Sequence, residues 1–279
     1  MKSSPRRERP ESTAQSPHVQ AKKSLGQNFL HDTGVLARIA ALAQPAAGSG
    51  IIEIGPGTGN LTEYLLKLGA PLHTVERDAS LVPILRARFG SELPIHLGDA
   101  AELDWPALLA DPGLGPHPVV VGNLPYYAAI PILFATLEAK PARLVFMVQK
   151  EVAARLIGHA SSPEYGQISV KIQMLADIRI GLRVGRGAFT PAPKVESAVI
   201  VLEPLESPRF SIKDWPRFSK LVTDGFAARR KTLVNSLLLS GHDPARVLAA
   251  LDALGLDPRV RGEALDLKQW AGIAHQLAL

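Results

Sequence analysis

Short apolar segments alternate with helical segments along much of this chain. Helical periodicity is visible in Asn60–Leu68, Ala79–Phe89 and Ile130–Glu138. This alternation predicts an α/β fold, with a doubly wound, mostly parallel sheet covered by helices on both faces. No clear helix separates the last two strands, which favours an antiparallel final pair. The expected strands are Ile51–Ile54, Leu72–Val75, Ile95–Leu97, Val119–Val121, Leu144–Val148, Ile178–Val184 and Ala198–Leu202.

Composition divides the 279 residues into three parts. Residues 1–21 are rich in Pro, Ser, Arg and Glu, which predicts a disordered basic tail. Residues 22–205 hold the α/β pattern, and the two prolines within Glu203–Pro208 indicate a boundary. Beyond it, apolar residues recur at helical spacing, so we expect a small all-helical domain over residues 206–279.

The composition also argues against several classes of protein. The chain has no cysteine, which excludes disulfides and thiolate metal sites and fits a reducing cytoplasm. Its eight histidines are scattered, so we expect no bound metal. No apolar run approaches the roughly 18 residues of a membrane span, and the N-terminus lacks an apolar signal core. We therefore expect a cytoplasmic protein without membrane contact. We also expect a monomer.

The positive charge is concentrated in two regions. Residues 1–23 carry six Lys or Arg against two Glu, and residues 206–231 carry seven against three acidic residues. The net charge of the whole chain is +5, so the remainder is slightly acidic. Two basic patches suggest a polyanionic partner such as nucleic acid, although charge alone does not distinguish such a site from an ordinary solvated surface.

A glycine-rich turn follows the first expected strand. The segment Ile51–Thr62 (IIEIGPGTGNLT) has the order strand, turn and helix start. In an open α/β sheet such a turn lies at the carboxyl ends of the strands, where ligands bind. Gly55 and Gly57 fit the first two positions of a dinucleotide fingerprint, but the third position falls on Asn60. This spacing argues against a nicotinamide-dependent oxidoreductase.

Two acidic residues follow the next two strands. Glu76 ends the second strand, where a carboxylate can accept hydrogen bonds from both ribose hydroxyls of an adenosine. Asp99 follows the third strand, where a carboxylate can accept from an adenine amino group. Each acid alone is commonly a surface or capping residue. Together with the turn they predict an adenosine pocket without phosphate-binding charge, which fits S-adenosylmethionine better than NAD.

The fourth strand ends in the segment Val119–Tyr127 (VVVGNLPYY). The side-chain oxygen of Asn123 and a backbone carbonyl near Leu124 can accept hydrogen bonds from an adenine amino group. Pro125 fixes the backbone, and Tyr126 offers a ring on which a flipped base can stack. Such a site would support transfer of a methyl group to the exocyclic nitrogen of adenine. No strong base would be required. The alternative is a simple turn whose tyrosines fill the rim.

The chain resembles the bacterial ribosomal RNA adenine dimethyltransferase family over nearly all of residues 22–240. The shared segments are Lys22–Leu30 (KKSLGQNFL), Glu53–Thr62 (EIGPGTGNLT), Val75–Asp78 (VERD), Gly98–Ala100 (GDA), Gly122–Tyr126 (GNLPY), Val148–Val152 (VQKEV), Tyr165–Ser169 (YGQIS), Phe189–Ser197 (FTPAPKVES) and Phe226–Leu233 (FAARRKTL) with Asn235. Single motifs occur in many methyltransferases, whereas the combination is specific. The tail before Lys22 lies outside the shared pattern.

This resemblance implies a class I S-adenosylmethionine-dependent methyltransferase fold, Rossmann-like with a seven-stranded sheet, followed by the helical domain. It implies dimethylation at N6 of two adjacent adenosines in a hairpin near the 3′ end of 16S rRNA, within the maturing small ribosomal subunit, with S-adenosylhomocysteine as the product. By matching position, the residues expected to contact or line the cofactor site are Asn28, Leu30, Gly55, Gly57, Glu76, Asp99 and Asn123.

The resemblance also assigns residues to the RNA. Asn123 to Tyr126 are expected to hold the target adenine, and Phe189 to lie on the other side of that base. Arg229, Arg230 and Lys231 are expected to contact rRNA phosphates. Two alternatives remain at this point. One is a methyltransferase for DNA adenine or a protein glutamine amide, and the other is a ribosome-assembly factor that binds RNA without catalysis.

Overall fold

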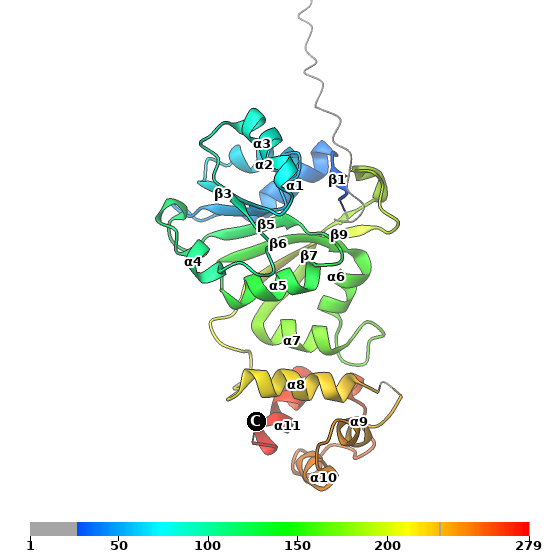
Figure 1. Ribbon diagram of the computed structural model, residues 1–279. Coiled ribbons are helices and arrows are strands. Elements are labelled where there is room, and N and C mark those ends of the chain that lie inside the picture. The colour runs from blue at the N-terminus through cyan, green and yellow to red at the C-terminus, as the bar shows by residue number, and fades with distance from the viewer. Residues whose placement is uncertain (1–26, 229, 279) are drawn as a thin grey trace, which may run out of the picture.

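The computed structural model describes residues 27–228 and 230–278, and the centre of the described part is a seven-stranded sheet (Figure 1). Its order is β4-β3-β2-β5-β6-β9-β7. The bounds are β2 Ile51–Ile54, β3 Leu72–Glu76, β4 Ile95–Leu97, β5 Val119–Asn123, β6 Arg143–Gln149, β7 Ala176–Val184 and β9 Ser197–Pro204. Strands β4, β3, β2, β5 and β6 run parallel to one another, and β9 runs antiparallel to both β6 and β7. The predicted mostly parallel sheet and its antiparallel final pair are confirmed.

Helices cover both faces of this sheet (Figure 1). In β5, Val119 and Val121 join the core that includes α1 and α2, whereas Val120 joins the core that includes α5. Successive side chains of a strand point to opposite faces, so a wholly apolar strand is buried on both sides. The helices are α1 Thr33–Ala43, α2 Asn60–Leu66, α3 Val82–Phe89, α4 Trp105–Leu109, α5 Ala129–Glu138, α6 Lys150–Ile157 and α7 Gln167–Leu175, with 3₁₀ turns η2 Ala79–Leu81, η3 Pro112–Leu114 and η4 Arg186–Ala188.

Two predicted helices differ from the observed ones at their ends. The segment Ala79–Phe89 begins as the 3₁₀ turn η2 and becomes α-helical only at Val82. The Asp78 side chain accepts a hydrogen bond from the backbone N–H of Ser80, which closes this tight first turn. The predicted helix Asn60–Leu68 ends at Leu66 because the chain turns at Gly69, which has φ +72°.

A second, two-stranded sheet pairs the start of the described chain with a distant loop. Strand β1 (Phe29–Leu30) runs antiparallel to β8 (Phe189–Thr190), with Leu30 opposite Phe189. The backbone N–H of His31 extends this contact by donating to the carbonyl of Ala188 at 2.9 Å. Strands of two residues have no periodicity, so the sequence did not predict this sheet. It fixes the segment before α1 beside the carboxyl ends of the large sheet.

Beyond β9 the described chain is helical. Each of its four α-helices begins at a side chain that accepts a hydrogen bond from the first turn: Asp214, Thr232, Asp243 and Asp266. The helices are α8 Trp215–Phe226, α9 Leu233–Leu239, α10 Pro244–Ala253 and α11 Leu267–Gln276, with the 3₁₀ turn η5 Gly262–Ala264. Gly225 lets α8 approach α11 closely, because a Cβ at this position would lie 2.4 Å from the ring of Trp270.

The core of these helices is shared with α7. It joins Phe218 of α8 and Trp270 of α11 to Val170 and Met174 of α7. Tyr165 is buried in the same core, and its hydroxyl donates to the carbonyl of Leu265 at 2.8 Å. Both parts of the chain therefore contribute to one continuous apolar contact, and the predicted boundary between residues 205 and 206 stays a prediction.

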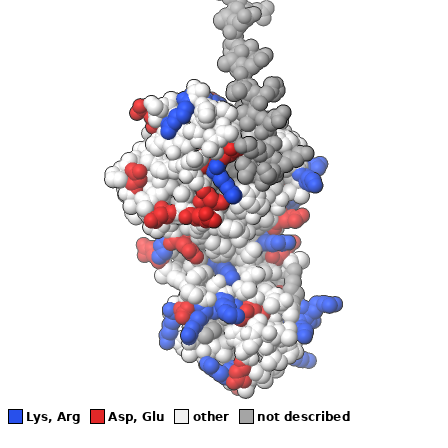
Figure 2. Space-filling view, in the orientation of Figure 1, with Lys and Arg blue, Asp and Glu red and all other residues white. Residues whose placement is uncertain are grey.

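The two parts differ in surface charge. Figure 2 shows Lys and Arg side chains gathered over the C-terminal helices on the face that it draws, while Asp and Glu are prominent over the sheet. Exposed cations include Lys213 before α8, Arg217 and Lys220 on it, and Arg230 and Lys231 after it. Among the described helices, none combines the length and hydropathy that a membrane span requires.

Candidate active site

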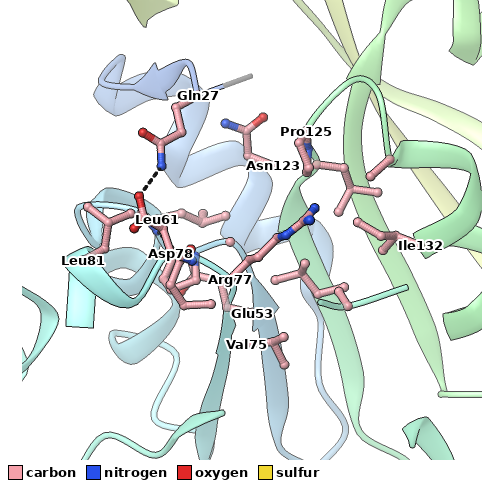
Figure 3. A pocket seen from close by; sticks show the side chains of 18 of the residues that line it. Gln27, Glu53, Leu61, Val75, Arg77, Asp78, Leu81, Asn123, Pro125 and Ile132 are labelled. Carbon is pink, nitrogen blue, oxygen red and sulfur yellow. Dashed lines mark hydrogen bonds between the residues drawn. The ribbon is translucent and has the colours of Figure 1, made fainter. Parts of the chain in front are cut away.

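A cavity lies at the carboxyl ends of β2, β3 and β5 (Figure 3). This edge of a parallel sheet is where open α/β folds bind ligands. Residues predicted to contact the cofactor or the target base line the cavity together: Asn28, Leu30, Gly55, Gly57, Glu76, Asp99, Asn123, Leu124, Pro125 and Tyr126. The structure thus brings together residues that are up to 98 positions apart in the chain, from Asn28 to Tyr126.

The glycine-rich turn forms one wall of the cavity. Gly55 and Gly57 have φ values of +66° and +61°, a conformation that disfavours any residue with a Cβ. A Cβ on Gly57 would also lie 3.2 Å from the ring of Phe29. Glycine at this position therefore allows β1 to close over the turn.

Glu76 is held at the end of β3 by backbone amides. Its two carboxylate oxygens accept hydrogen bonds from the N–H of Gly57 at 3.1 Å and of Asp78 at 2.8 Å. Burial raises the pKa of this carboxyl, and the amide hydrogen bonds act in the opposite direction. Each oxygen keeps a second lone pair, so Glu76 can still accept from two neighbouring hydroxyls of a ligand.

Asp99 lies at the next strand end and has two partners. One carboxylate oxygen accepts from the backbone N–H of Ala101 at 3.0 Å. The other is 3.0 Å from Nη1 of Arg77, and the same nitrogen donates to the hydroxyl of Tyr127 at 2.7 Å. Both Arg77 and Tyr127 line the cavity. The sequence did not single out Arg77, although it stands between Glu76 and Asp78.

Asn123 ends β5 on the opposite wall. Its side-chain nitrogen donates to the backbone carbonyl of Asn28 at 3.1 Å. This contact uses the donor end of the amide, so the side-chain oxygen is the end that can accept from a substrate. The backbone after it is tied to the sheet, because the N–H of Leu124 donates to the carbonyl of Met147 at 3.2 Å.

Tyr126 and Phe189 have different surroundings. The hydroxyl of Tyr126 is 2.9 Å from Oγ of Ser197 at the start of β9, and burial raises the pKa of the phenol. Tyr126 thus has a fixed position at the cavity. Phe189 is only 4% exposed, joins the core beneath α1, and is not among the residues that line the cavity. Its predicted contact with the target base stays a prediction.

The predicted RNA-binding residues lie away from the cavity. Arg230 and Lys231 are exposed in the connection between α8 and α9. Arg229 lies outside the described residues, as do the basic tail over residues 1–21 and the shared segment as far as Gly26. Neither Arg230 nor Lys231 lines the cavity, so any contact with RNA would be made at a second location.

Glu53 is a cavity residue to which the sequence assigned no role. It is 1% exposed, and the hydroxyl of Thr62 donates to its carboxyl at 2.6 Å. Burial raises its pKa to about 8, so the neutral acid dominates at pH 7. Glu53 could have been recognised from the sequence as a cavity residue, because it is the one polar residue of an otherwise apolar strand and stands two residues before Gly55.

Comparisons with known proteins agree with this geometry. A protein with 45% identity over 93% of this chain and 94% of its own length is "Ribosomal RNA small subunit methyltransferase A" of Anaeromyxobacter sp. (strain K). The protein of the same name from Pseudomonas aeruginosa is 40% identical over 92% of this chain and 95% of its own length.

Solved structures with the same fold include a dimethyladenosine transferase from Plasmodium falciparum, with a TM-score of 0.74, 23% identity, and coverage of 90% of this chain and 97% of that one. Another is the 23S rRNA methyltransferase ErmE, with a TM-score of 0.66, 25% identity, and coverage of 90% and 100%. With its mostly parallel seven-stranded sheet, the chain has the class I methyltransferase fold.

The family model for "Ribosomal RNA adenine dimethylase" matches residues 18–278, which is nearly the whole chain. The cavity, the acids at two strand ends and the Asn-Leu-Pro-Tyr segment all lie within this match. On these grounds the chain belongs to the ribosomal RNA adenine dimethylase family.

Proposed function

We propose that this protein uses S-adenosylmethionine to dimethylate N6 of two adjacent adenosines in a hairpin near the 3′ end of 16S rRNA, within the maturing small subunit. The observation that carries the proposal is the cavity, which is lined both by two acids at strand ends and by the segment from Asn123 to Tyr126. The names of the relatives, which specify the small subunit, support this RNA as the substrate.

The cavity fits the proposed cofactor. Glu76 is held by the N–H groups of Gly57 and Asp78, one on each carboxylate oxygen, and can still accept from the ribose hydroxyls. Asp99, fixed by the N–H of Ala101, can accept from the adenine amino group. When bound, S-adenosylmethionine supplies an electrophilic methyl group on a sulfonium. Asn28 and Leu30 complete the wall beside the glycine turn.

The opposite wall can activate the target nitrogen. The lone pair of an adenine amino group is delocalised into the ring, which makes the nitrogen a weak nucleophile. Oxygen atoms of Asn123 and of the Leu124–Pro125 backbone accept its N–H groups and favour a tetrahedral nitrogen. Tyr126, held by Ser197, supplies a surface for stacking of the base. The amine loses its proton after the transfer, so no strong base is needed.

The RNA would rest on the C-terminal helices as well as at the cavity. Arg230 and Lys231 are exposed cations directly after α8, and Lys220 lies on that helix. Such side chains bind phosphates and position an RNA without reading its bases. A cytoplasmic location, a monomeric state and the lack of a bound metal stay predictions.

The decisive experiment is transfer of labelled methyl groups from S-adenosylmethionine to unmodified small ribosomal subunits, followed by nucleoside analysis. We expect the label in N6,N6-dimethyladenosine, at both of two neighbouring positions. Binding of cofactor and subunit without any label would instead identify a ribosome-assembly factor. Label in another nucleoside or in a ribosomal protein would refute the proposed substrate.

A further inference from the structure

Arg77 connects the two walls of the cavity. Figure 3 shows its side chain extended from the end of β3 toward the segment of Asn123 and Pro125. A single nitrogen, Nη1, lies 3.0 Å from Oδ2 of Asp99 and donates to the hydroxyl of Tyr127 at 2.7 Å. These two contacts form a bridge between the proposed adenine site and the proposed substrate segment.

The bridge uses the oxygen that a ligand would need. Oδ1 of Asp99 accepts from the N–H of Ala101, so Oδ2 is the oxygen turned toward Arg77 and the cavity. An adenine amino group that bonds to Oδ2 must share this atom with the guanidinium or displace it. The side chain of Asp99 is 22% exposed and that of Arg77 is 51% exposed, so this arginine has room to leave.

The other end of the bridge is the residue after Tyr126. Tyr127 is 55% exposed, an unusually high value for a large aromatic side chain. Its exposed ring is available to an RNA, whereas its hydroxyl is tied to Arg77. A movement that swings the guanidinium out of the bridge would therefore free both Asp99 and Tyr127.

We propose that Arg77 is a positioning residue that links occupancy of the adenine site to the position of Tyr127. Without cofactor the bridge holds Tyr127 against β3. When the adenine amino group takes Oδ2 of Asp99, the bridge opens and Tyr127 turns toward the RNA. Cofactor and RNA would then each strengthen the binding of the other, because both favour the open state. This inference rests on the proposed cofactor.

The first test measures cofactor affinity by calorimetry in the full chain. Arg77→Leu removes the competitor for Asp99, and since an exposed ion pair contributes little, we expect S-adenosylhomocysteine to bind about two- to fivefold more tightly. Tyr127→Phe removes one end of the bridge and should give a smaller gain. The double variant should bind no more tightly than Arg77→Leu, because the two residues act through one bridge.

Matched controls are Arg259→Leu and Tyr64→Phe. Arg259 is an exposed arginine paired with Asp257, and Tyr64 lies on α2 beside Lys67. Neither lines the cavity, so both variants should bind S-adenosylhomocysteine as the wild type does. Thermal unfolding of every variant identifies any loss of fold.

The second test measures binding of unmodified small subunits with and without S-adenosylhomocysteine. The product should strengthen subunit binding by the wild type, and this gain should vanish in Arg77→Leu. Two results would overturn the bridge alone, provided that the wild type binds S-adenosylhomocysteine. One is an affinity of Arg77→Leu for S-adenosylhomocysteine that is unchanged or weaker, and the other is a product-induced gain in subunit binding that persists in Arg77→Leu. No cofactor binding by the folded wild type would overturn the proposed function and the bridge together.

Discussion

The cofactor cavity and the basic face of the C-terminal helices are held by different forces. In the cavity, Glu76 is buried and fixed by two backbone amides, and Glu53 is buried beside Thr62. On the basic face, Arg230 and Lys231 are exposed to water. The cavity should therefore depend on the geometry of a few atoms, whereas the basic face should act through summed charge and weaken in salt.

The largest effect should follow removal of the amide on the substrate wall. Asn123→Ala deletes the oxygen that we propose accepts from the target amino group, and we expect single-turnover methyl transfer to fall about a hundredfold or more, as for other preorganised polar groups. Subunit binding should change little, because the basic face is intact. A variant that transfers methyl groups at the wild-type rate would disprove the role given to Asn123.

A smaller effect is expected at Glu76, the acid of the proposed ribose site. Glu76→Gln replaces one acceptor oxygen by a donor that faces a backbone N–H, so we expect cofactor affinity to fall about tenfold or more. Glu63→Gln is the matched control, because Glu63 is an exposed carboxylate on α2 paired with Lys67 and Arg88. Calorimetry should show a loss only for Glu76. Equal losses in both variants would contradict the local role.

Glu53 predicts a pH dependence of stability. Its pKa is about 8 in the folded protein against 4.5 for the unperturbed group, so the folded state binds the additional proton. The stability contributed by protonated Glu53 is full below pH 4.5 and is lost as the pH rises through about 8. Relative to wild type, Glu53→Gln should therefore gain about 2 kcal/mol or more between pH 5 and pH 8.

Denaturant unfolding at several pH values measures this difference. If the stability of Glu53→Gln follows the same pH curve as the wild type, Glu53 does not titrate as its burial implies.

The smallest effects belong to the basic face. Arg230→Ala or Lys231→Ala should each weaken subunit binding only a few-fold, at about 1 kcal/mol or less. Each should also reduce the slope of log affinity against log salt concentration by about one. Cofactor affinity should stay the same. Arg259→Ala removes an exposed charge elsewhere and serves as the control. Filter binding at several salt concentrations measures these affinities. A loss of subunit affinity that is the same at every salt concentration would contradict the electrostatic role.

The sequence predicted the parts of the site that follow from local pattern. Ile51–Ile54 and Ile95–Leu97 coincide with β2 and β4, because short β-branched or apolar runs between turns have few alternatives. Once the strands are parallel, their ends must meet at one edge of the sheet. Glu76, Asp99 and Asn123 could be placed together on that basis.

Contacts between side chains from distant segments could not be predicted in this way. The bridge from Arg77 to Tyr127 joins residues 50 positions apart through one nitrogen, and no periodicity records it. The pairing of Leu30 with Phe189 likewise involves strands of only two residues. The burial of Phe189 depends on which side of that small sheet faces α1, which the sequence alone does not determine.

The core shared by α7 and the C-terminal helices has a consequence for how the proposed RNA substrate would bind. Because Tyr165, Val170 and Met174 belong to the same buried cluster as Phe218 and Trp270, the helices that carry the basic face pack directly against the part that holds the cavity. An RNA that rests on the basic face and reaches into the cavity must span the distance between them. If the protein methylates two neighbouring adenosines as proposed, both nucleotides cannot meet this requirement at once, and the RNA would have to move by one nucleotide between the two modifications.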